Sequence, residues 1–229
     1  TWEPDPVRYP NGMEPVATAA HNHGFKFLLW FEPERVAYGS WIMENHPDWV
    51  LFGNDAPLLH LGNPEALAWV KNHFSTMISE IGIDCYRQDF NLSPLSSWRN
   101  NDASDRQGMN EITHITGLYE YWDYLLSQHP GLLIDNCASG GRRIDIETLK
   151  RSYDLWRSDT WWFPDAEQCI NYGLSFWIPI TGQGSLYAVP YDFRSGIGSH
   201  ISVAVNFNEP DGLALWKAAV DELNSVRHL

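Results

Sequence analysis

Short apolar runs alternate with helical patterns along this chain of 229 residues, and the alternation limits its fold more than any other feature. The run GFKFLLWFE (24–32) follows a helical pattern at 12–23, and IDCYRQDF (83–90) follows a longer one at 64–81. Apolar strands separated by helices are typical of a parallel sheet covered by helices. We therefore predict an α/β fold.

The same alternation continues through the rest of the chain. We predict further helices at 110–128, 144–151, 165–175 and 210–227, and further strands at 132–139, 153–159, 176–181 and 199–207. The polar segment SPLSSWRNNDASDRQGMN (93–110) is predicted to form one long loop. The ends of the helix at 64–81 are marked by Asn63 as N-cap, Pro64 as the first helical residue and Gly82 as the stop.

Two α/β architectures fit this pattern, a doubly wound sheet and a (β/α)8 TIM barrel. A nucleotide-binding doubly wound domain carries a glycine-rich loop after an early strand, and GGRR (140–143) is only a weak match. The side chains suited to chemistry instead follow successive strands at their carboxyl ends: Trp30, Glu32, Asp89, Cys137 and Asp159. TIM-barrel enzymes gather their active sites at that rim, so we predict a barrel.

The pattern yields six strands, whereas a closed barrel of this class has eight. We therefore expect strands 3 to 8 of the barrel to be present and strands 1 and 2 to be missing. No internal repeat or linker divides the sequence, so residues 1–229 are expected to be one partial catalytic domain.

Charge and hydropathy limit the partners of the chain. The net charge of −14 repels a polyanion, so we expect no nucleic acid partner. No apolar run reaches the roughly 20 residues of a membrane-spanning helix, so we expect no membrane partner. The oligomeric state stays open, a homo-oligomer included.

Cysteine and histidine spacing points away from metals and disulfides. The three cysteines, Cys85, Cys137 and Cys169, lack paired spacing and slightly favour a reducing, cytoplasmic compartment. No CxxC or HExxH motif is present, and we expect neither a metal nor an organic cofactor. Aromatic residues are abundant, with 12 Trp, 10 Tyr and 10 Phe. They either fill a core or offer flat faces to a sugar ring.

Two carboxylates end predicted strands, Asp89 in YRQDFN (86–91) and Asp159 in WRSDTWW (156–162). Cleavage of a glycosidic bond needs one carboxylate at the anomeric carbon and one carboxylic acid for the leaving oxygen. A pair of salt bridges at a barrel rim explains the same residues equally well. Glu32, which is followed at once by Pro33, is interpreted as a structural hydrogen-bond acceptor at the rim.

Several motifs resemble one known family, in the same order along nearly the whole chain. They are WFEPERV (30–36), HPDW (46–49), LGNPEALAWV (61–70), YRQDFN (86–91), CASGGRRID (137–145) and RSD (157–159). Together they resemble the melibiase-type α-galactosidases of glycoside hydrolase family 36. The resemblance implies a (β/α)8 catalytic domain and a retaining double displacement on α-linked galactosides.

The resemblance also implies roles for individual residues. Asp89 resembles the nucleophile and Asp159 the general acid/base of the family. Trp30, Cys137 and Gly140 match positions that line the galactose subsite. From the residues alone, a core aromatic, an inert buried thiol and a turn glycine explain these three as well.

Four positions bear on which sugar is bound. Arg87 stands where the family has Lys, and Gln88 stands where it has Trp. Arg142 replaces a third glycine, while Arg143 keeps the expected arginine. Arg87 and Arg143 are therefore taken as substrate-binding candidates. Since Arg and Lys present different hydrogen-bonding geometry, the sugar is left open.

Three alternatives remain beside hydrolysis of terminal α-galactosyl residues. The same machinery could act on an α-N-acetylgalactosaminide, or transfer the sugar to another sugar. A non-catalytic carbohydrate-binding or degenerate fragment is the alternative outside the enzymes.

Overall fold

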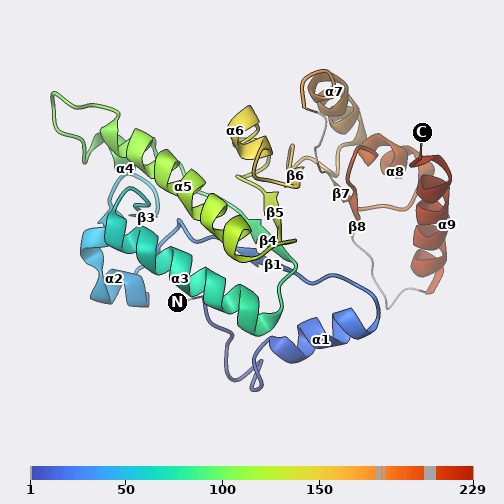
Figure 1. Ribbon diagram of the computed structural model, residues 1–229. Helices are drawn as coiled ribbons and strands as arrows, with labels where there is room; N and C mark the ends of the chain where they lie inside the picture. Colours follow the sequence, from blue (N-terminus) through green and yellow to red (C-terminus); the bar gives the residue numbers. More distant parts are fainter. Residues whose placement is uncertain (1, 179–181, 183, 204–209, 229) are drawn as a thin grey trace. The chain divides into compact units, whose positions relative to one another are not determined.

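The computed structural model describes residues 2–178, 182, 184–203 and 210–228. The chain forms two compact units (Figure 1). The first comprises residues 1–138 and 150–152, and the second comprises residues 139–149 and 153–229.

The first unit is built on three parallel strands, β1 (Leu28–Phe31), β4 (Cys85–Gln88) and β5 (Leu133–Asn136). Their order is β1-β4-β5, as expected for strands joined by helical crossovers. Trp30 pairs with Arg87, and Arg87 pairs with Asp135. Because neighbouring residues in register share a face, these three side chains form one row across the sheet.

Helices α3 (Pro64–Ile81) and α5 (Met109–Gln128) pack side by side and cover the opposite face of this sheet (Figure 1). The Tyr86 ring of β4 meets Phe74 of α3 and Tyr121 of α5 in edge-on contacts. Helix α1 (Glu14–Asn22) packs on α3. The resulting core of the unit is apolar and buried, and its largest fully buried members include Trp122, Tyr86, Tyr121 and Phe74.

The ends of α3 confirm the prediction residue for residue. The Asn63 side chain accepts hydrogen bonds from the backbone N–H groups of Glu65 and Ala66. Pro64 occupies the first helical position, and Gly82 ends the helix with φ 80°, a left-handed conformation that favours glycine. The helix at 12–23, the helix at 110–128 and the strands at 24–32, 83–90 and 132–139 are likewise present, with ends that differ by a few residues.

The stretch between β1 and α3 holds structure that the pattern did not predict. It contains α2 (Trp41–Asn45), the 3-10 turn Pro47–Trp49 and an antiparallel pair, β2 (Val50–Leu51) with β3 (Leu58–Leu59). These elements are too short to establish a sequence period. Their buried residues, such as Ile42 and Trp49, nevertheless join the core of the unit.

The prediction of one long loop at 93–110 is wrong in part, because α4 (Leu95–Arg99) lies within it. Trp98 explains the helix, since its ring is buried in a small cluster with Phe90 and Leu92. After α4, the Asp102 carboxylate accepts hydrogen bonds from the backbone N–H groups of Gly108 and Asn110, so it fixes the turn before α5.

The second unit contains α6 (Ile146–Leu149), β6 (Asp154–Leu155), α7 (Pro164–Leu174), β7 (Gly184–Ser185), α8 (Pro190–Gly196), β8 (Ser202–Val203) and α9 (Pro210–Val226). Trp156 bridges Gly182 in parallel, and β7 pairs with β8 in parallel. Phe193, Trp216 and Ala219 form its small core.

The strand predicted at 176–181 is wrong where the structure describes it. Phe176 and Trp177 lie in a turn, because the N–H groups of Trp177 and Ile178 both bond to the Leu174 carbonyl and prolong the coil of α7. Residues 179–181 lie outside the described part. The next strand that the structure describes is β7, and the prediction at 199–207 overlaps β8, with 204–207 outside the described residues.

Two features are absent from the described residues. None of their helices is long and apolar enough to cross a membrane. No group of three or more His, Cys, Asp or Glu side chains among them is arranged to hold a metal ion. No disulfide joins the three cysteines, all of which are described, and Cys85 and Cys137 are buried while Cys169 is exposed.

Candidate active site

Asp89 follows the last residue of β4, at the carboxyl end of the sheet. Its backbone N–H bonds to the Phe31 carbonyl at 2.9 Å and continues the ladder to β1. The carboxylate accepts hydrogen bonds from the Phe90 backbone N–H at 2.7 Å and from the Trp30 indole Nε1 at 3.3 Å. With 8% of its surface exposed, Asp89 is held on both oxygens as an acceptor.

Trp30 combines this hydrogen bond with an accessible ring. It lies on β1 beside Arg87 and is 46% exposed, so it is not a core aromatic. An indole whose edge fixes a carboxylate while its face stays open is suited to a sugar ring next to that carboxylate. The contact between Trp30 and Asp89 was not predicted from the sequence.

Arg87 is paired with an acidic residue that sequence reasoning missed. Its Nη1 lies 2.8 Å from Oδ2 of Asp135, in register on β5. Burial alone would lower the pKa of the Arg87 guanidinium. The charge and hydrogen bond of Asp135, with smaller contributions from Cys137 and Asp89, outweigh burial and raise that pKa. The sequence did offer a sign of this partner, because Asp135 is an acidic residue inside the apolar run LLIDNCAS of the neighbouring predicted strand.

Cys137 is the first residue after β5. Its N–H donates to the Gln88 carbonyl at 2.9 Å, and the residue is 2% exposed. Its side chain shares the strand face of Asp135, two residues earlier. The structure thus brings Trp30, Arg87, Asp89 and Cys137 together at one end of the first unit.

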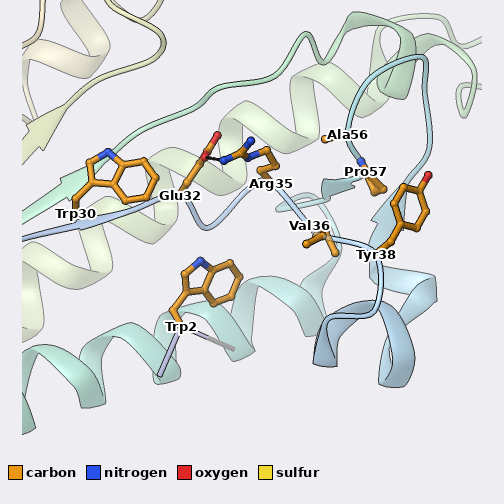
Figure 2. Close-up of a pocket in the computed structure, with 9 residues that line it drawn as sticks. Trp2, Trp30, Glu32, Arg35, Val36, Tyr38, Ala56 and Pro57 are labelled. Atoms are coloured by element: carbon orange, nitrogen blue, oxygen red, sulfur yellow. Dashed lines mark ion pairs between the residues drawn. The ribbon is translucent and has the colours of Figure 1, made fainter. Parts of the chain in front are cut away.

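Glu32 serves as the structural acceptor that was predicted. It is 4% exposed, and Oε1 accepts the Asn91 backbone N–H at 2.5 Å while Oε2 pairs with Arg35 at 2.6 Å. It therefore ties the segment after β1 to the segment after β4. Figure 2 shows this ion pair at the side of an open cavity of ≈ 540 Å³, with Trp30 at one end and Trp2 below. The lining of this cavity includes Trp30 and Glu32 but not Asp89.

In the second unit, Asp159 is exposed and follows β6 by four residues. Its Oδ1 accepts a hydrogen bond from the Trp156 indole Nε1 at 2.9 Å. Each candidate catalytic carboxylate is thus bonded to the indole N–H of a tryptophan on the same unit. The contact between Trp156 and Asp159 was also not predicted from the sequence.

Buried polar groups hold the segment that carries Asp159. Glu167 of α7 is 1% exposed, and its Oε1 accepts hydrogen bonds from the hydroxyls of Ser158 and Thr160 at 2.7 and 2.8 Å. Its Oε2 lies 3.5 Å from Nε of Arg157, which also donates through Nη2 to the Gly196 carbonyl. Residues on both sides of Asp159 are therefore anchored while its carboxylate stays accessible.

Two glycines pack against this same segment. Gly140 has φ 79°, and a Cβ there would lie 3.0 Å from the Asp159 backbone nitrogen and from Ser158 Cα. A Cβ on Gly141 would lie 2.5 Å from the Arg157 carbonyl oxygen. Close approach of backbone to backbone thus requires glycine at both positions.

The two arginines after the glycines differ in environment. Arg143 is 9% exposed, and its carbonyl accepts the Thr148 hydroxyl at 2.7 Å, which links it to α6. Arg142 is exposed, and its Nη2 donates to the Ser139 hydroxyl at 2.6 Å. Gly140, Arg143 and Asp159 belong to the second unit, whereas the other four site candidates belong to the first.

Residues 1–202 match the sequence profile of the melibiase family. An α-galactosidase of Escherichia coli is 33% identical over 192 residues, which cover 78% of this chain and 25% of that protein. The structure of an α-galactosidase from Lactobacillus brevis superposes with a TM-score of 0.87 at 26% identity, over 100% of this chain and 34% of that one.

A family 36 α-galactosidase from Geobacillus stearothermophilus, solved in complex with raffinose, superposes with a TM-score of 0.86 at 22% identity. The superposition covers 100% of this chain and 35% of the chain of that enzyme. The chain thus spans about a quarter to a third of the length of these proteins. Because the profile covers most of its length, the chain belongs to the melibiase family.

Proposed function

We propose that this chain carries the catalytic machinery of a retaining glycoside hydrolase that releases terminal α-galactosyl residues. The observation that carries the proposal is the Asp89 carboxylate, held by Trp30 and Phe90 at the carboxyl end of a parallel strand, in a chain of the melibiase family. The α-galactosidase names of its relatives support the reaction.

Asp89 is the nucleophile in this proposal. Its carboxylate attacks the anomeric carbon as the bond to the leaving oxygen breaks, which gives a β-linked glycosyl-enzyme. The Trp30 and Phe90 N–H groups aim the carboxylate. Phe90 holds Oδ1 at the shorter distance, so Oδ2 is the oxygen we assign to the attack.

Asp159 is the general acid/base. As the acid it gives its proton to the leaving oxygen, and as the carboxylate it then takes a proton from the attacking water. Water restores the α configuration and frees Asp89. The exposed position of Asp159 suits exchange of the departing group for water, and the Trp156 indole orients one carboxylate oxygen.

We assign the sugar subsite to Trp30, Arg87, Cys137, Gly140 and Arg143. Trp30 offers its exposed ring face, and Arg87 offers a guanidinium already oriented by Asp135. The small thiol of Cys137 allows close approach of a ring, and Gly140 packs against the backbone that carries Asp159. A galactoside such as raffinose, bound by one structural relative, is the class of substrate we infer.

We also propose that the parallel strands described here are strands 3 to 8 of a (β/α)8 barrel and that residues 1–229 form part of one catalytic domain. The crossovers through α3 and α5 and the parallel pairing within each unit support this assignment. In such a barrel, the ends of β4 and β6 face the same rim, which would place Asp89 and Asp159 about 5–5.5 Å apart for a retaining pair.

Azide rescue of two alanine variants tests the mechanism in the natural full-length protein. Asp159→Ala should slow substrates with poor leaving groups far more than activated aryl α-galactosides, and azide should restore turnover with an α-glycosyl azide as product. Asp89→Ala should abolish turnover of both substrate types, and azide should then give the β-glycosyl azide.

The anomer of the azide product separates the two roles. The same anomer from both variants, or near-normal turnover by Asp89→Ala, would contradict the assignment. Product analysis with a sugar acceptor in place of water tests the transferase alternative, because only the second step differs. A wild-type protein that binds galactosides without cleaving them would support the non-catalytic alternative.

A further inference from the structure

Gln88 lies directly before Asp89 and points to the other side of the sheet. Its side chain is 0% exposed, behind β4, on the face covered by α3 and α5. The amide Nε2 donates to Oε2 of Glu34 at 2.8 Å, and Oε1 accepts from the Trp122 indole Nε1 at 2.8 Å. Both ends of the amide are therefore engaged, one by the segment after β1 and the other by α5.

Glu34 is itself held by a histidine whose tautomer follows from its partners. His114 is fully buried, and its Nδ1 accepts the Leu61 backbone N–H at 3.2 Å. The proton of the neutral ring then resides on Nε2, which donates to Oε1 of Glu34 at 2.8 Å. Gln88 thus joins Trp122 of α5 to Glu34 in a buried chain of hydrogen bonds that continues through His114, also on α5, to the Leu61 backbone.

This chain acts on the backbone that carries Asp89. The Gln88 carbonyl accepts the Cys137 N–H, and the Asp89 N–H donates to the Phe31 carbonyl, both at 2.9 Å. These bonds hold the backbone of residues 88 and 89 between β1 and β5. Residues 88 and 89 point to opposite faces of the sheet, so a rotation of the backbone at this point moves both side chains together.

We propose that Gln88 is a positioning residue for Asp89. Clamped between Glu34 and Trp122, it sets the angle at which the Asp89 carboxylate projects toward Trp30 and the sugar. The inference rests on the proposed role of Asp89 as nucleophile and adds a residue on the far face of the sheet to that reaction. A displacement of reacting groups by 1 Å can cost about 10²-fold in rate, so this clamp has a measurable consequence.

Gln88→Met removes the amide and keeps the length of the side chain. In the full-length protein we expect kcat on an aryl α-galactoside to fall by about 10²-fold, with KM changed by less than roughly threefold. Tyr86→Phe is the matched control. It removes the buried bond between the Tyr86 and Tyr121 hydroxyls, at 2.9 Å, which joins the same strand to the same helix two residues earlier.

The control separates positioning from stability. We expect both variants to lower the melting temperature, whereas only Gln88→Met lowers kcat. Equal kcat in wild type, Tyr86→Phe and Gln88→Met would show that Gln88 serves stability alone and would overturn the proposal.

Exchanging the two polar groups provides a rescue. Gln88→Glu alone sets a carboxylate against Glu34 and should lower kcat at least as much as Gln88→Met. In the double variant Glu34→Gln with Gln88→Glu, the new amide at position 34 accepts from His114 and donates to the new carboxylate at position 88, which still accepts from Trp122. We expect kcat to return to within about tenfold of wild type. A folded double variant as slow as Gln88→Glu would contradict the proposal.

Crystal structures of the same variants test the positioning role of Gln88 without any measurement of activity. The hydrogen bond from Trp30 Nε1 to Asp89 Oδ2 should be lost in Gln88→Met and present in Tyr86→Phe and in the double variant. An unmoved Asp89 carboxylate in Gln88→Met would overturn the positioning role. An inactive wild-type protein would instead contradict the proposed function, and the Asp89 geometry in these structures would still test Gln88.

Discussion

The indole Nε1 of Trp30 donates a hydrogen bond to Oδ2 of Asp89 across 3.3 Å, from one parallel strand to the end of the next. One residue thereby offers a ring face to a ligand and orients the carboxylate beside it. A tryptophan in this place therefore acts on both the binding and the chemical step.

Trp30→Phe separates these two effects. The phenyl ring keeps a flat apolar face, but the donor to Asp89 is gone. Hydrogen bonds to charged groups are worth roughly 1.5–3 kcal/mol, so kcat/KM for α-galactosides should fall about 10- to 100-fold, mostly through kcat. Trp41→Phe, at a comparably exposed tryptophan of α2, should leave both constants unchanged. A pure KM effect at Trp30 would show that the indole N–H does not serve Asp89.

Arg87 provides a test of sugar choice. Its guanidinium is a planar fork of N–H donors, unlike the compact lysine ammonium, and it is held in one orientation by Asp135. Arg87→Lys should shift the ratio of kcat/KM for galactosides over N-acetylgalactosaminides toward galactosides by about tenfold, which corresponds to ~1.4 kcal/mol. Asp135→Asn keeps the arginine and removes the charge that orients it, so it should lower kcat/KM for both sugars. An unchanged ratio in Arg87→Lys would remove Arg87 from the residues that set the sugar.

Strong local signals were enough to predict much of the fold. The helix at 64–81 was predictable to the residue, because an Asn-Pro start, a helical apolar period and a glycine stop all agree. The short elements between β1 and α3 have no period, and α4 forms because Trp98 is buried in a cluster that includes Leu58 and Ala138, which are distant in sequence. Such tertiary contacts override local composition, so the loop prediction at 93–110 failed there.

The sequence predicted that the candidate site residues follow strand ends, but it did not predict their hydrogen-bond partners. Strand ends pointed to Asp89 and Asp159, because parallel strands collect chemistry at that end. The indole donors Trp30 and Trp156 could not be paired with them from sequence, because each bond depends on side-chain direction in space. In the sequence, Gln88 stood out only as a departure from the family. Its buried hydrogen bonds to Glu34 and Trp122 explain why a glutamine fits this position.

His60 makes stability depend on pH. Burial, followed by the electrostatic interaction with His114, lowers the pKa of His60 to about 4 against the opposing effect of Asp102. Between the ordinary pKa of about 6.5 and pH 4, the unfolded chain binds a proton that the folded chain does not. Stability from this group is therefore complete above pH 6.5 and is lost as the pH falls toward 4.

Thermal unfolding at a series of pH values checks this prediction. The melting temperature should decline as the pH is lowered from 7 to 4, and His60→Gln should flatten the part of the decline that lies between pH 6.5 and 4. Parallel curves for wild type and variant would mean that His60 is as easily protonated in the folded protein as in the unfolded chain.

Gly140 connects a backbone requirement to the acid/base candidate. With φ 79° and a potential Cβ only 3.0 Å from the Asp159 nitrogen, Gly140→Ala suffers both left-handed strain and a backbone clash. Gly12→Ala is the matched control, because Gly12 has φ 71° and no atom within 4 Å of its potential Cβ. Both variants incur about 1–2 kcal/mol of conformational strain, and only Gly140→Ala adds the clash.

Two readouts should therefore diverge at Gly140. Its melting temperature should fall further than that of Gly12→Ala, because residues 158–159 must move to admit the methyl group. Since the moved residue is the proposed proton donor, turnover of galactosides with poor leaving groups should fall by about 10-fold or more relative to activated aryl galactosides. Gly12→Ala should preserve that ratio. Equal melting temperatures and an unchanged ratio in Gly140→Ala would show that the backbone contact with Asp159 does not govern proton transfer.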